Sequence, residues 1–190
     1  TISEVQQREL IETVLEAVKK SRRLATANCF NMGALDSNDR RVLVERHLIS
    51  PALADGTGER VVLFNADESL SVMINEEDHL RLQALAPGQG GAEVWASVNA
   101  LDDEISAALQ VAYSDERGFL TACPTNTGTG LRVSGLMHLP ALVLTEDMER
   151  VIQGLTQLSF TVRGVYGEGT NAAGNLFQVS NQSTLGKSEK

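Results

Sequence analysis

The chain has 190 residues, of which 42% are hydrophobic and 22% charged, a composition typical of a soluble globular protein. Its formal net charge of −9 disfavours nucleic acid as the main partner, because a phosphate backbone calls for a basic face. The sequence shows neither a run of about 18 apolar residues nor a signal-peptide pattern, so nothing in it argues for membrane insertion or export.

The two cysteines, Cys29 and Cys123, lie far apart in sequence and neither has a histidine at metal-ligand spacing. This pattern indicates neither a zinc site nor a disulfide framework, and it favours a reducing cytoplasm. We expect Cys29 to be a small buried apolar residue.

Apolar spacing predicts alternating helices and strands in the first part of the chain. The expected elements are a helix capped by Ser3, a strand at 28–32, a helix at 37–47, and strands at 60–65 and 70–74 joined as an antiparallel hairpin. Val42 and Leu43 are expected to lie on the buried side of the second helix.

Three consecutive acids, Glu76, Glu77 and Asp78, follow this hairpin directly. Neighbouring carboxylates repel one another at the end of an apolar strand, so the run is either a charged surface loop or part of a site. The residues alone leave both readings open.

The stretch Arg117–Pro140 has a composition that packing alone does not explain. Gly128 and Gly130 form a turn where a backbone can approach a ligand closely, and Arg132 follows on the next expected strand. An anion site and a glycine-rich hairpin with a surface arginine are both compatible with this window.

The remaining segments complete an α+β pattern, a mainly antiparallel sheet flanked by helices. Glu168 lies between two glycines in a loop that either closes over a substrate or is plainly exposed. The other expected elements are a helix at 91–113, a helix capped by Thr145 that runs to Leu155, and strands at 161–166 and 176–180.

Three motifs together resemble the phosphagen kinases, a family of ATP:guanidino phosphotransferases. They are NEEDH at 75–79, CPTNTGTGLR at 123–132 and RGVYGEG at 163–169. The segments VERHLISP, MINEEDH and FQVSNQ resemble the bacterial protein-arginine kinase branch most closely. The resemblance, which runs from about Arg41 to the end, implies the guanidino kinase catalytic-domain fold, which is glutamine synthetase-like.

The resemblance implies a nucleotide site for ATP with Mg²⁺. Phosphoryl transfer depends on positioning and charge neutralisation, so cations must surround the phosphates. By resemblance these cations are Arg81, Arg132 and Arg163, and His47 lies beside the adenine. The sequence offers no protein ligand set for a resident metal.

The resemblance also implies the acceptor site. A guanidinium has a pKa above about 12 and needs carboxylates to orient it and take its proton. Glu77 matches the catalytic base, Glu168 the second guanidinium-binding carboxylate, and Cys123 the thiol that lines the pocket.

Two departures from the animal enzymes count against a free amino acid as the substrate. Leu136 stands where those enzymes carry a histidine, and Gln178 where they carry an aspartate. The family's SxRxRxxRN strand has no match, so we expect residues 1–190 to be a single domain, the central part of a catalytic domain without that strand and the closing helices.

The expected function is ATP-dependent phosphorylation of arginine side chains in client proteins, which marks clients for proteolysis. The resemblance implies protein clients with exposed arginine, an activator protein, a chaperone–protease complex and a homodimer. A kinase for free arginine or another small guanidine, and a non-catalytic module that binds nucleotide or partners, remain alternatives.

Overall fold

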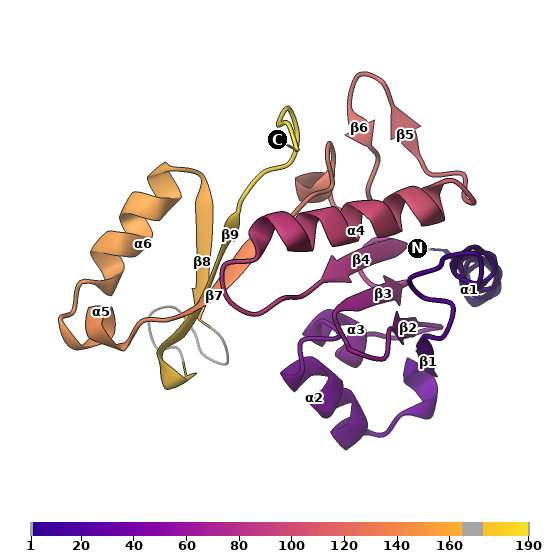
Figure 1. Ribbon diagram of the computed structural model, residues 1–190, viewed down its shortest axis with the longest axis horizontal. Helices are drawn as coiled ribbons and strands as arrows, with labels where there is room; N and C mark the ends of the chain where they lie inside the picture. The colour runs from indigo at the N-terminus through magenta and orange to yellow at the C-terminus, as the bar shows by residue number, and fades with distance from the viewer. Residues whose placement is uncertain (1, 165–172, 190) are drawn as a thin grey trace. The chain divides into compact units, whose positions relative to one another are not determined.

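The computed structural model describes residues 2–164 and 173–189, and the chain divides into two compact units, Thr1–Val111 and Ala112–Lys190 (Figure 1). Each unit has its own sheet and its own helices. The assignment of the whole chain to a single domain stays a prediction.

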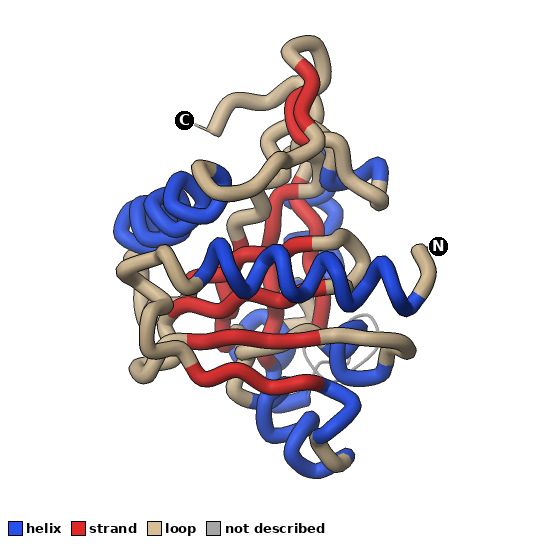
Figure 2. The backbone as a smooth tube through the Cα atoms, turned by 90° about the vertical axis from the view of Figure 1, so that its right-hand side faces the viewer, coloured by secondary structure: helices blue, strands red, loops and turns tan. Residues whose placement is uncertain are grey.

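The first unit is built on a four-stranded antiparallel sheet in the order β1-β2-β3-β4, whose strands lie side by side in Figure 2. The strands are β1 (Asn28–Asn31), β2 (Val61–Phe64), β3 (Leu70–Ile74) and β4 (Leu80–Ala84). The helices are α1 (Glu4–Val18), η1 (Met32–Ala34), α2 (Ser37–Glu45), α3 (Pro51–Asp55) and α4 (Gly91–Ser106).

The central strands of this sheet are apolar on both faces because each face is covered. One face packs against α1 and α4, and its cluster includes Val72, Leu101 and Ile105, none of them exposed. The other face packs Val62 and Met73 against the segments around α2 and α3. Every residue of β2 and β3 is therefore buried, a pattern that alternation alone does not produce.

The predicted hairpin at 60–65 and 70–74 and the helix capped by Ser3 are confirmed. Two burial predictions are wrong. Cys29 is exposed because β1 is an edge strand, and Val42 is 50% exposed because α2 turns its neighbours Leu43 and Val44 toward the core instead.

A carboxylate of α4 ties that helix to the segment after α1. The Ser21 hydroxyl donates to Glu104 Oε2 at 2.6 Å, and the Arg22 N–H donates to the same oxygen at 3.1 Å. The Ser21 hydrogen bond holds the pKa of Glu104 below its ordinary value. The link therefore stabilises the fold more strongly when Glu104 is ionised than when it is protonated.

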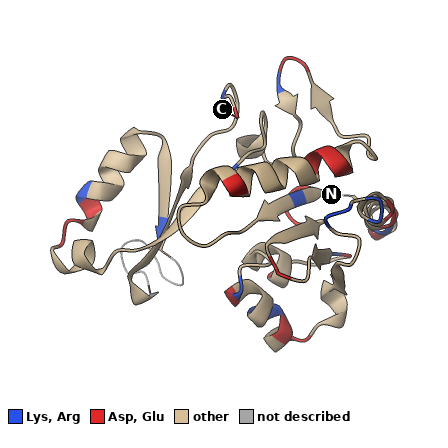
Figure 3. Cartoon of the chain, in the orientation of Figure 1, with Lys and Arg blue, Asp and Glu red and all other residues tan. Residues whose placement is uncertain are grey.

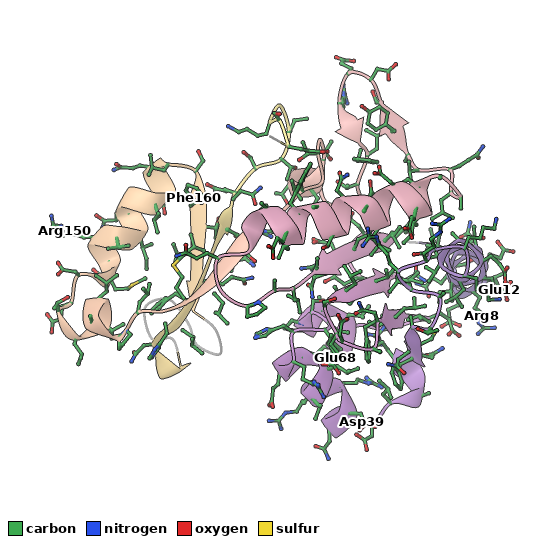
Figure 4. All side chains as sticks on the ribbon, in the orientation of Figure 1. Arg8, Glu12, Asp39, Glu68, Arg150 and Phe160 are labelled. Carbon is green, nitrogen blue, oxygen red and sulfur yellow. The ribbon has the colours of Figure 1, made fainter. Side chains whose placement is uncertain are left out.

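We expect Glu104→Gln to lower the free energy of unfolding by about 1 kcal/mol at pH 7. The folded-state pKa lies below the unfolded-state value, so the stabilisation is complete above the unfolded-state pKa. It disappears as the pH falls through the folded-state pKa. Urea unfolding, followed by the fluorescence of Trp95 in α4, measures the difference in unfolding free energy between the wild type and the variant at pH 7 and in strong acid. Glu12→Gln on the exposed side of α1 is the control (Figure 4), and an equal loss in strong acid would contradict the assignment.

The second unit contains a three-stranded antiparallel sheet in the order β7-β9-β8 and a small hairpin of β5 and β6. The strands are β5 (Tyr113–Ser114), β6 (Gly118–Phe119), β7 (Ser134–His138), β8 (Phe160–Gly164) and β9 (Leu176–Asn181). The helices are η2 (Pro124–Asn126), α5 (Pro140–Leu144), α6 (Met148–Gln157) and η3 (Ala173–Asn175).

Thr145 does not cap a helix that runs to Leu155, so that prediction is wrong. Its hydroxyl donates to Ala141 O at 3.0 Å and thereby closes α5, whose first residue is Pro140. The longer helix, α6, begins only at Met148. The helix expected at 91–113 likewise ends at Ser106.

The α+β class is confirmed, because the paired strands of the described chain are antiparallel and helices flank them. Within that same part of the chain, none of the helices has the length and apolarity that a bilayer crossing requires.

Candidate active site

The predicted site residues fall in both units. His47, Glu77 and Arg81 belong to the first unit, and the second unit carries Cys123, Arg132 and Arg163. Glu168 lies outside the described residues. Figure 3 shows the basic positions on β4 and β8, which are those of Arg81 and Arg163.

The turn between β3 and β4 presents Glu77 at the surface. Asn75 opens this turn with a left-handed backbone, φ 60°, which asparagine tolerates better than most residues. Its N–H donates to His79 O at 3.0 Å, and its side-chain nitrogen donates to Gln7 O at 3.2 Å and Glu59 O at 2.9 Å. The turn that carries Glu77 is thus anchored to α1 and to the segment before β2.

The same turn contains a nearly buried carboxylate, that of Glu76. Its side chain is 6% exposed and receives three hydrogen bonds. The Ser50 hydroxyl donates to Oε1, Arg81 Nη1 donates to Oε1 at 3.0 Å, and the Glu77 N–H donates to Oε2 at 3.2 Å. Glu76 therefore holds both the guanidinium of Arg81 and the backbone of Glu77.

Ser50 extends this network to a helix. Its oxygen caps α3 by accepting the Leu53 N–H at 3.0 Å, and Pro51 occupies the first turn. Sequence reasoning missed the roles of Ser50 and Glu76. The Ser-Pro pair signals a helix start, but a cap that also contacts a residue 26 positions away is not visible in sequence.

The backbone of His47 is fixed to the strand that carries Arg81. His47 has a left-handed φ of 59°, and its carbonyl accepts from Gln83 Nε2 at 2.6 Å. Gln83 follows Arg81 by two residues on β4, so both side chains lie on one face of the sheet. Next to His47, Arg46 pairs with Glu68 at 2.6 Å.

In the second unit, hydroxyl groups hold the loop that carries Cys123. The sulfur lies 3.0 Å from Thr125 Oγ1. The Thr184 hydroxyl is 3.1 Å from Thr125 O and 2.7 Å from Thr127 O and donates toward both. The segment after β9 therefore braces the loop from one side.

Gly128 is required at its position by close backbone packing. Its φ is 113°, and a Cβ there would lie 2.6 Å from Thr184 O. Its own N–H and carbonyl pair with Phe119 at 3.1 and 2.8 Å. Close backbone packing therefore explains why this position is a glycine, as the reading of the segment as a glycine-rich hairpin expects.

Arg163 lies in one row with the two positions that depart from the animal enzymes. On β9, Gln178 pairs with Arg163 of β8 on one side and with Leu136 of β7 on the other. Gln178 Nε2 also donates to Ser134 Oγ at 2.9 Å. Of the two altered positions, Gln178 is thus the direct neighbour of a predicted phosphate-binding arginine, and Leu136 lies one strand further along the same row.

No group of three or more His, Cys, Asp and Glu side chains in residues 2–164 and 173–189 is arranged to hold a metal ion. Mg²⁺ that is bound chiefly through substrate phosphates needs only one or two protein carboxylates. The acidic turn at 76–78 provides such donors.

Two bacterial relatives share about half of their residues with the chain. The protein-arginine kinase of Moorella thermoacetica is 57% identical over 152 residues, which is 80% of this chain and 43% of that protein. The protein-arginine kinase of Halalkalibacterium halodurans is 53% identical over 159 residues, 84% of this chain and 45% of that protein. The chain thus spans less than half the length of these curated relatives.

Solved structures share the fold. The duplicated taurocyamine kinase from Schistosoma mansoni with bound transition state analog components has a TM-score of 0.87 at 25% identity, covering 99% of this chain and 27% of that chain. Lombricine kinase has a TM-score of 0.77 at 23% identity, covering 98% and 55%. The family model described as ATP:guanido phosphotransferase, C-terminal catalytic domain, matches residues 9–190. The chain therefore belongs to the ATP:guanido phosphotransferase family.

Proposed function

We propose that the protein phosphorylates arginine side chains of other proteins with the γ-phosphoryl group of ATP. One structural observation carries the proposal: Glu77 and Arg81, an exposed carboxylate and a cation, are held on one hairpin by the buried carboxylate of Glu76. The relatives named protein-arginine kinase support the choice of acceptor.

Glu77 acts on the acceptor. A guanidinium keeps its proton at neutral pH and is then a poor nucleophile, so a carboxylate must orient it and accept the proton. The lone pair of the guanidino nitrogen attacks the γ-phosphorus, the bond to the ADP oxygen breaks, and the proton passes to Glu77. Glu168 and Cys123 complete the acceptor pocket in this proposal, on the strength of their motifs.

The nucleotide is held by cations. Arg81, Arg132 and Arg163 bind the phosphates, and His47 lies beside the adenine. Charge that spreads over the phosphoryl oxygens is stabilised by such fixed cations before the reaction begins. Mg²⁺ would be held by the phosphates of ATP and by carboxylates of the acidic turn at 76–78, and it would supply further charge neutralisation there.

A protein acceptor fits the chain better than a small one. Gln178, one of the two positions that differ from the animal enzymes, pairs with Arg163, and the other, Leu136, pairs with Gln178 from the opposite side. The net charge of −9 also favours the approach of arginine-bearing basic segments. The alternative, a kinase for free arginine or a small guanidine, is favoured by the structural relatives named for taurocyamine and lombricine.

The partners in this proposal are client proteins with exposed arginine, an activator protein, a chaperone–protease complex that consumes the product, and a second copy of the chain as a homodimer. A cytoplasmic location is part of this proposal, because the number and spacing of the two cysteines in the sequence indicate no disulfide framework.

Competition separates the two acceptors. The complete natural protein is incubated with Mg·ATP and casein while free arginine is added in excess. We expect the labelled γ-phosphoryl group of ATP to be transferred to casein, and the amount of labelled casein to decrease little when free arginine is added. Strong competition with no labelled protein would favour the small-guanidine kinase, and ATP binding without any transfer would favour a non-catalytic module.

A further inference from the structure

Asn181 contacts the backbone on both sides of Arg132. The ladder between β7 and β9 ends at the pair Ser134 and Ser180, yet the chain before β7 continues beside Asn181. The Val133 N–H donates to Asn181 Oδ1 at 2.8 Å, and Asn181 Nδ2 donates to Leu131 O at 3.0 Å. One side chain therefore continues the sheet's hydrogen bonding past its last residue pair.

Only a carboxamide of this length makes both contacts. Asparagine carries an acceptor and a donor on one planar group, whereas aspartate lacks the donor. The Asn181 N–H also donates to Val133 O at 3.3 Å, so main chain and side chain hold the same residue. Asn181 is partly buried in this position.

The segment that carries Arg132 needs such a restraint. It follows two glycines with left-handed backbones, Gly128 at φ 113° and Gly130 at φ 63°. The residue itself is exposed and has a long side chain, so the position of its backbone determines which places its guanidinium can reach. Fixing the two flanking peptides restricts the directions that the side chain can take.

We propose that Asn181 is a positioning residue that holds Arg132 in register for the phosphates of ATP. The inference rests on the proposed function, because it needs Arg132 to bind nucleotide. It adds that β9 sets the place of two phosphate-binding arginines, since Gln178 of the same strand pairs with Arg163.

A double-mutant cycle on the complete natural protein tests this. The dissociation constant of Mg·ADP is measured by calorimetry for the wild type, Asn181→Ala, Arg132→Ala and the double variant. We expect Asn181→Ala to weaken binding about tenfold, as the loss of two hydrogen bonds allows. In the Arg132→Ala background the same change should have almost no effect, because the group that it positions is gone.

Asn65→Ala is the matched control. That amide also accepts a backbone N–H, from Leu70 at 2.9 Å, and donates to Ser69 Oγ at 3.0 Å, but it closes the β2–β3 hairpin of the first unit. It should leave nucleotide affinity unchanged. If Asn181→Ala fails to fold, Asn181→Ser takes its place in the cycle.

Three outcomes overturn the inference. Wild-type affinity in the Asn181 variant, together with a loss in Arg132→Ala, refutes the positioning role and leaves the proposed function standing. Losses that multiply in the double variant show that Asn181 acts independently of Arg132. Unchanged affinity in Arg132→Ala removes that arginine from the nucleotide site, and the inference falls with it.

Discussion

Glu77→Gln should lower the rate of arginine phosphorylation by about 10² to 10⁴, the range expected when a general base is lost. The amide keeps the size of the side chain but cannot accept the guanidinium proton at neutral pH. Because Glu77 is exposed at the tip of an anchored turn, the change should leave the fold intact. Initial rates with saturating Mg·ATP and a casein acceptor measure it.

Glu116→Gln is the control for this variant, since Glu116 is likewise an exposed acid in a tight turn, the one between β5 and β6. It should keep the wild-type rate. A Glu77→Gln enzyme of normal activity would remove Glu77 from catalysis, and equal losses in both variants would point to a general effect of charge.

Arg81→Ala should reduce kcat/KM by about 10³, the lower end of what one transition-state arginine contributes in phosphoryl transfer. Arg81→Lys should fall between, because lysine keeps the charge but loses the planar fork. Steady-state kinetics with varied ATP give both values. The exposed pair of Arg41 and Glu45 on α2, 3.8 Å apart, provides the control Arg41→Ala.

Arg81 also contributes to the fold, so its kinetic effect must be separated from stability. Its removal takes one of three hydrogen bonds from the little-exposed Glu76 carboxylate. The unfolding midpoint of Arg81→Ala without nucleotide should drop slightly, while its kinetic loss persists well below that temperature. A loss of activity that follows the unfolded fraction would contradict a direct role on the phosphates.

The regular parts of the fold could be predicted from the sequence because the patterns that indicate them are local. The hairpin of β2 and β3 follows from two apolar runs around a polar turn, and α1 follows from the cap at Ser3. The wrong predictions concern residues whose structure depends on contacts with other parts of the chain. Thr145 bonds back to Ala141 and ends α5, and Cys29 is exposed because nothing pairs with the outer edge of β1 among the described strands.

The candidate site divides in the same way. Sequence motifs identify four of the predicted site residues, Glu77, Arg81, Arg132 and Arg163. The residues that hold them in place belong to no such motif. Asn181 meets Val133 across 48 positions, and Ser50 meets Glu76 across 26. Such contacts depend on strand register and on where a helix starts, which no single window contains. Glu168 and its assigned role stay a prediction.

The most direct measurement is the chemical identity of the product. The complete natural protein is incubated with Mg·ATP and casein, and the modified peptides are sequenced by mass spectrometry under conditions that preserve P–N bonds. We expect phosphoryl groups on arginine side chains, acid-labile and base-stable, and their loss in Glu77→Gln. Phosphorylation of hydroxyl side chains instead, or no transfer by a protein that binds Mg·ATP, would contradict it.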